Sequence, residues 1–190
     1  MPTFEKCNGA VLDLAENLIR EYETHHPLGA AGVRIDYLFA YPNYDENDKP
    51  IGFALKERGR QILGKTRIIN LSDRAKGHGD AEIKLDGEFW DDAPEAERKA
   101  LLDHELHHIS VMMTASGTVK KDDCDRPRLR LRKHDVEVGW FNLIAQRHGV
   151  HSVERQQANA IMEHAGQFYW PELVSAHEGR MSKLETRVSK

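Results

Sequence analysis

The sequence predicts an α+β fold in which a small sheet packs against one long helix and further helices follow. Segments rich in β-branched and aromatic residues lie in the first half of the chain, and segments with apolar residues at helical spacing dominate the second half. The 190 residues, 39% of them hydrophobic, suit one globular domain whose core needs no disulfide bonds. We therefore expect a single domain over residues 1–180 and a polar C-terminal tail over residues 181–190.

The first half of the chain predicts one helix and four strands. Apolar residues recur at helical spacing over residues 10–22, and Pro27-Leu28-Gly29 is expected to end that region. The turn-rich residues 42–50 and the glycine-containing residues 72–80 are expected to be loops. The strand candidates are residues 33–41, 51–55, 66–71 and 82–89.

The second half predicts a long helix that opens near Asp91–Pro94, where Asp92 followed by Glu95 resembles a capping box. Gly117 is expected to end this helix. Its apolar stripe is formed by Leu102, Leu106, Ile109 and Met113. A basic strand over residues 126–133 and helices over residues 134–147 and 153–168 complete the prediction.

Overall composition and charge do not indicate a nucleic-acid or membrane partner. The net charge of −4 does not favour nucleic acid, and no apolar run approaches the roughly 20 residues of a membrane helix. The N-terminus lacks the basic and apolar regions of a secretory signal. Cys7 and Cys124 are the only cysteines and are expected to be free. These features predict a cytoplasmic protein with no membrane partner.

Three of the eleven histidines lie within five positions, at His104, His107 and His108. Residues four apart on a helix share one face, so His104 and His108 can direct imidazole nitrogens at a single ion. Zinc binds such nitrogens at about 2.0–2.1 Å and favours four ligands. Glu105 projects beside that face, where it can take a proton from water. This HExxH spacing indicates a zinc hydrolase with Glu105 as general base, whereas His107 is expected to be solvated.

A catalytic zinc site needs a third protein ligand. The metzincin extension is absent, because Val111 and Thr114 stand where that pattern requires Gly and His. His134 is the best candidate, since it begins the next predicted helix after a connection long enough to turn the chain back. Glu137, one turn later, is the alternative. Asp135 could orient a ligand histidine.

Residues 59–66 match the phosphate-binding pattern GxxxxGK[ST] in full. A P-loop needs a strand before it and a helix after it. The residues that follow Thr66 are β-branched and then glycine-rich, which is a poor start for a helix. We therefore expect a turn ending at Gly64, then a strand, and no nucleotide.

Arg128, Arg130 and Arg132 alternate with Leu129 and Leu131. On a strand this alternation places three arginines on one face. A solvated strand face is the simpler interpretation, but the same face could make weak contact with nucleic-acid phosphates.

Three segments carry a resemblance to a known family. They are Gly64-Lys65-Thr66-Arg67, close to a GKAR-like signature, residues 101–108 with the sequence LLDHELHH, and His134-Asp135-Val136-Glu137, close to HDVEE. By these segments the chain resembles the phage metallopeptidases, which are distantly similar to the SprT-like zincins. It departs from the family pattern at Thr66, where alanine is expected, and at Val138, where an acidic residue is expected. The resemblance implies a minimal zincin domain, one zinc ion and a phage or prophage origin, hence the host cytoplasm.

The expected reaction is hydrolysis of a peptide bond at a zinc ion held by His104, His108 and His134, with Glu105 as general base. The strand over residues 82–89 is expected to border the cleft and to pair with an extended peptide. Two alternatives stay open. One is a zinc amidohydrolase with a non-peptide substrate, and the other is a zinc-stabilised nucleic-acid-binding module without catalysis. Glu105 distinguishes the enzyme from the module, because a purely structural zinc site has no use for a base.

Overall fold

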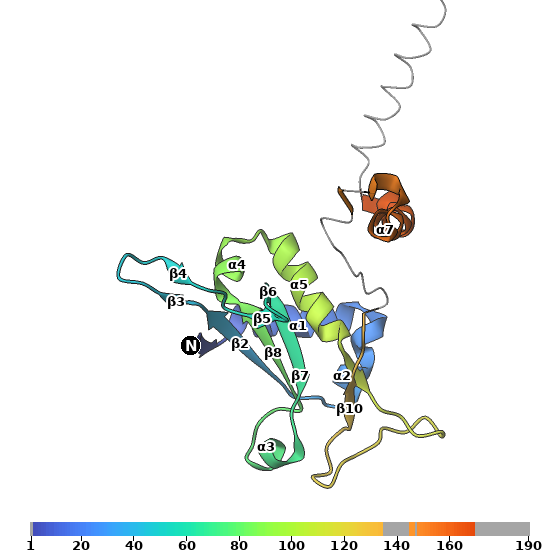
Figure 1. The fold of residues 1–190 in the computed structure, drawn as a ribbon. Helices are drawn as coiled ribbons and strands as arrows, with labels where there is room; N and C mark the ends of the chain where they lie inside the picture. Colours follow the sequence, from blue (N-terminus) through green and yellow to red (C-terminus); the bar gives the residue numbers. More distant parts are fainter. Residues whose placement is uncertain (1, 135–144, 147, 170–190) are drawn as a thin grey trace, which may run out of the picture. The chain divides into compact units, whose positions relative to one another are not determined.

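The computed structural model describes residues 2–134, 145–146 and 148–169 (Figure 1). The chain divides into two compact units, residues 1–134 and residues 135–190. The single domain predicted over residues 1–180 stays a prediction.

In the described part of the second unit, the 3-10 helix η2 (Gly149–His151) precedes helix α7 (Val153–Tyr169). Helix α7 confirms the helix predicted over residues 153–168. Most of the helix predicted over residues 134–147, and the whole predicted tail, lie outside the described residues. None of the helices in the described ranges is both long enough and apolar enough to cross a membrane.

The first unit is built on a four-stranded sheet with the order β1-β2-β8-β7. Its strands are β1 (Thr3–Lys6), β2 (Ile35–Tyr41), β7 (Gly64–Ile68) and β8 (Ala81–Asp86). Strands β2 and β8 run parallel at the centre, and β1 and β7 pair antiparallel with them as the two edges. The strand predicted over residues 33–41 is thus confirmed as β2.

The strand predicted over residues 82–89 is corrected in two respects. Strand β8 ends at Asp86, which is the N-cap of helix α4 (Gly87–Asp92). The Asp86 side chain accepts a hydrogen bond from Phe89 N. Both neighbours of β8 are occupied, by β2 and β7, so it cannot pair with a further peptide. The edge strand next to Glu105 is β7, which begins two residues before the predicted residues 66–71 and ends at Ile68.

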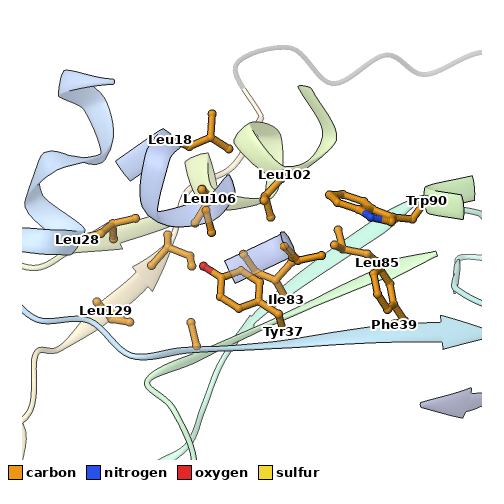
Figure 2. Close-up of a cluster of buried hydrophobic side chains, with 14 residues drawn as sticks. Leu18, Leu28, Tyr37, Phe39, Ile83, Leu85, Trp90, Leu102, Leu106 and Leu129 are labelled. Atoms are coloured by element: carbon orange, nitrogen blue, oxygen red, sulfur yellow. The ribbon is translucent and has the colours of Figure 1, made fainter. Parts of the chain in front are cut away.

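Helices α1 (Gly9–Glu21) and α5 (Glu95–His107) pack against one face of this sheet, and the main hydrophobic core lies between them (Figure 2). Helix α1 confirms the prediction over residues 10–22. Leu102 and Leu106 of α5 are fully buried in this core, and burial of each side chain contributes about 1.5–3 kcal/mol. The core therefore anchors the face of α5 that lies beside the histidines.

The remaining described elements of the first unit are short. They are η1 (Glu23–His25), α2 (His26–Ala30), β3 (Asn43–Tyr44), β4 (Pro50–Ile51), β5 (Lys56–Glu57), β6 (Arg60–Gln61), α3 (Leu71–Ala75), β9 (Ile109–Val111) and β10 (Leu129–Leu131). The strand predicted over residues 51–55 is wrong beyond Ile51, because Gly52 has a φ of 82° and breaks the strand. Helix α2 lies where the sequence predicted only the end of the first helix, and most of helix α3 lies in the predicted loop over residues 72–80.

Helix α5 is shorter than predicted at both ends. Pro94 is its N-cap and Asp92 still belongs to α4, so the predicted capping box does not form. At the other end, His108 is the C-cap and β9 follows immediately. The β-branched residues of β9 pair with β10, and Arg132 N donates to His108 O at 2.7 Å. The prediction of a helix up to Gly117 is therefore wrong, and Met113 is not a core residue of it.

A buried ionic network holds the connection between β9 and β10 against the loop near α3. The guanidinium of Arg74 lies 2.6 Å from a carboxylate oxygen of Asp122, and it also donates to the backbone oxygens of Ile69 and Asp80. Asp80 is fully buried and forms a 2.7 Å ion pair with Arg126. The network thus fixes the hairpin whose second strand leads to His134.

Candidate metal centre

Three imidazoles converge in the first unit from three local structures. His104 lies in the last turn of α5, His108 is the C-cap of that helix, and His134 follows β10. The Nε2 atom of His104 lies 3.2 Å from Nε2 of His108 and 3.2 Å from Nε2 of His134. One ligand nitrogen of each ring lies within 4.8 Å of the other two. The structure therefore brings together the three residues that were predicted to bind metal.

The chemistry of this donor set fits a metal ion. The Nδ1 of His108 lies 2.9 Å from the carbonyl oxygen of Arg132, which can only accept, so this contact favours the tautomer with its proton on Nδ1 and its lone pair on Nε2. Burial lowers the pKa of His104, and the nearby rings of His108 and His134 lower it further, which favours the neutral form that binds metals. Nitrogens on one tetrahedral zinc at about 2.0–2.1 Å are about 3.3–3.4 Å apart, close to the spacing seen here.

Glu105 lies beside the histidines but turns toward strand β7. Its side chain is buried, and Thr66 Oγ1 donates a hydrogen bond to Oε2 at 2.7 Å. Gly64 lies directly against the carboxylate: a Cβ on residue 64 would overlap Oε1 and come within 2.8 Å of Cγ. Burial raises the pKa of Glu105, and the hydrogen bond from Thr66 opposes that rise. Strand β7 thus holds the carboxylate in place.

A groove of about 980 Å³ contains this site. One wall is the face of α5 that carries His104 and Glu105, and the other includes residues 61–66 and residues 131–134. The three imidazoles and Glu105 all line this one groove.

His107 is not the solvated residue that was predicted. It is half-buried, its ring lies 5.9 Å from that of the buried His25, and Arg132 donates to its Nε2 at 2.6 Å. His25 in turn lies 2.6 Å from Asp103, which fixes η1 to α5. These contacts support the helix turn that carries the histidines.

Arg132 therefore has a structural role at this site. Its carbonyl orients His108, its side chain contacts His107, and its position at the end of β10 places His134 two residues later. Arg128 and Arg130 are exposed, but Arg132 does not share a free face with them. The predicted three-arginine surface for nucleic acid is not supported.

The segment that matched a P-loop forms a different structure. Lys65 and Thr66 lie on β7, where a P-loop would require the start of a helix. The alternative ligand Glu137 and the orienting residue Asp135 lie outside the described residues.

Thr66 and Gly64 could not be recognised from the sequence as neighbours of Glu105. The available signal was the Gly64-Lys65-Thr66-Arg67 signature, which marked the segment without indicating its contact. Thr66 is also one of the two departures from the family pattern, and here its hydroxyl binds the carboxylate.

Comparison with known proteins identifies a family. A family model with the description "Putative phage metallopeptidase" matches residues 3–165, which is most of the chain. Neither the curated proteins nor the solved structures contain a match to this sequence.

Proposed function

The chain belongs to the putative phage metallopeptidase family, and from this premise we propose that it is a zinc-dependent hydrolase that cleaves peptide bonds. The observation that carries the proposal is the convergence of three imidazole Nε2 atoms beside a buried glutamate in one open groove. Three neutral nitrogen ligands leave a fourth zinc position for water or substrate, as in catalytic rather than structural sites.

In the proposed mechanism, His104, His108 and His134 hold the ion. When bound, zinc acts as a Lewis acid that makes a water more acidic, with a pKa of about 7, and polarises a carbonyl. Glu105 takes the proton of the attacking water and delivers it to the leaving amine. Because Thr66 occupies Oε2 and residue 64 has no side chain, Oε1 is the oxygen available for proton transfer.

The outer edge of β7 suits an extended peptide. Leu63 and Ile69, which flank β7, form backbone hydrogen bonds with Asp86 and Asp80, which flank or end β8. Because hydrogen-bonded residues alternate along an antiparallel ladder, the backbone groups of Lys65 and Arg67 also point toward β8. The backbone groups of Gly64 and Thr66 therefore point to the other side, and both residues line the groove. Among the described residues no strand pairs with this edge. A peptide added there would pass the imidazoles and Glu105.

Metal content tests the proposal most directly. Protein purified without a metal-affinity tag is expected to contain about one zinc per chain, and His134→Ala is expected to lose most of it because two imidazoles remain. His78→Ala, which removes an exposed histidine outside the cluster, serves as the matched control. Elemental analysis measures all three proteins.

The results can distinguish a wrong third ligand from a wrong metal-site proposal. Full zinc content in His134→Ala would show that another residue, such as Glu137, is the third ligand. An absence of zinc in the wild-type protein, even after zinc is added back, would contradict the peptidase proposal.

Replacement of Gly64 by alanine is expected to reduce kcat/KM for peptide hydrolysis by about 100-fold. The new Cβ would come too close to Glu105 Oε1 and displace the carboxylate, and a glutamate side chain is flexible enough to move without unfolding the protein. Gly9→Ala adds the same atom where no atom lies within 4 Å, and is expected to be neutral. Digestion of a peptide mixture followed by mass spectrometry measures the rates, with thermal unfolding as the check on folding. Wild-type activity in Gly64→Ala would contradict the assigned role of this contact.

A further inference from the structure

The groove differs in chemistry between its two ends. Helix α5 contributes Glu97, Ala100, Leu101, His104 and His108 to one wall, at the spacing of a single helix face. Ala100 and Leu101 therefore lie about one turn before His104, toward the start of the helix. Between His104 and Glu97, the residues of α5 that line the groove are the apolar Ala100 and Leu101.

The opposite wall at this end is also apolar. Ile62 and Leu63 precede β7, and Phe89 belongs to α4. Asp86 links these two segments, because its N–H donates to Leu63 O at 2.8 Å and its carboxylate accepts from Phe89 N at 3.2 Å. Leu63 and Phe89 are thus held close together, and both line the same groove as Ala100 and Leu101 of α5.

The other end of the groove is basic. Arg132 and Lys133 line it, next to His134, and Leu131 contributes an apolar side chain that is 48% exposed. Arg132 is already engaged with His107. The two ends would therefore favour different side chains of one bound peptide.

Building on the proposed function, we infer that the apolar end of the groove is a specificity pocket for a bulky aliphatic side chain of the peptide substrate. The pocket is formed by Ile62, Leu63, Phe89, Ala100 and Leu101. These side chains offer no polar group that could bind a polar or charged substrate side chain, whereas burial of an aliphatic one removes apolar surface from water on both partners. Glu57 and Glu97 line the same groove and disfavour an acidic side chain.

Binding of substrate-like chelators tests the pocket without turnover. The probes are short peptides that end in a hydroxamate, which coordinates zinc, and that differ only in carrying leucine, asparagine or lysine beside it. Asparagine has nearly the shape of leucine and no charge. Titration calorimetry on the zinc-loaded protein is expected to show that the leucine probe binds at least about tenfold more tightly than either of the others.

Two substitutions localise the preference. Leu63→Asn is expected to lower the ratio of leucine to asparagine affinity to about threefold or less. Leu12→Asn, which changes a leucine of similar exposure on α1 outside the groove (44% against 37%), is expected to leave the ratio unchanged. Zinc content and thermal unfolding of each variant show that the metal and the fold are retained, which both exposed positions should allow.

The outcomes test the aliphatic pocket separately from the proposed zinc site. Equal binding of the three probes to the zinc-loaded protein would overturn the aliphatic pocket and leave the metal-site proposal standing. A preference for the lysine probe, or an unchanged ratio in Leu63→Asn, would also overturn the pocket. A protein that holds no zinc would overturn the proposed function together with the pocket that rests on it.

Discussion

Replacement of Glu105 by glutamine is expected to reduce peptide hydrolysis by about 10³-fold or more, at the upper part of the range for loss of a general base. Glutamine has nearly the same size, and its amide oxygen can still accept the hydrogen bond from Thr66. It cannot take a proton from the attacking water. Because the side chain points toward β7 rather than into the set of imidazoles, the zinc content is expected to stay near that of the wild type.

The measurement compares turnover of a peptide mixture with elemental analysis of the same preparations. Glu95→Gln makes the same chemical change in the first turn of α5, outside the groove, and serves as the control. Unchanged turnover in Glu105→Gln would place the general base elsewhere. Loss of zinc along with activity would show that Glu105 supports metal binding instead of proton transfer alone.

Replacement of Arg74 by methionine is expected to lower the free energy of unfolding by about 3–5 kcal/mol. The Arg74 side chain is only 5% exposed, and its removal takes the closest cation from Asp122 and leaves Asp80 with Arg126 alone. Arg67→Met is the matched control, because Arg67 also forms a two-bond ion pair, with Glu82, but is 52% exposed. An exposed pair of this kind contributes about 0–1 kcal/mol.

Urea denaturation of the two variants and the wild type measures the difference. A loss in Arg74→Met no larger than that in Arg67→Met would show that the buried network does not hold the hairpin. The network also has a consequence at the metal site, since it fixes the hairpin whose second strand leads to His134. We therefore expect zinc to slow the unfolding of Arg74→Met when it is added to the protein.

Regular elements with a strong apolar pattern could be predicted from the sequence. Helix α1 and strand β2 match the expected ranges closely, because each buries one face against the same core. The ends of α5 could not be predicted in this way. The apolar spacing continues through Ile109, but that residue pairs with Leu131 across β9 and β10, a contact that depends on the fold of residues far apart in the chain.

The residues of the candidate site also differ in whether the sequence alone could identify them. The spacing of His104 and His108 is a local property of a helix, so it could be recognised in the sequence. His134 was selected from its place in the chain and from the family resemblance, and its ring does lie 3.2 Å from that of His104. The contacts of Glu105 with Gly64 and Thr66 depend on how β7 lies against α5, and no local pattern encodes that arrangement.

The unpaired edge of β7 could also pair with another copy of the protein. Backbone groups that can receive a peptide can equally receive the same strand of another molecule, which is how sheet proteins begin to aggregate. Strand β7 is only five residues long, and its two exposed side chains are Lys65 and Arg67. Two such strands brought together would bring copies of Lys65 close to one another, whereas Arg67 is already paired with Glu82. The short length of β7 and the exposed Lys65 thus oppose such pairing at the edge where the proposed function places a peptide.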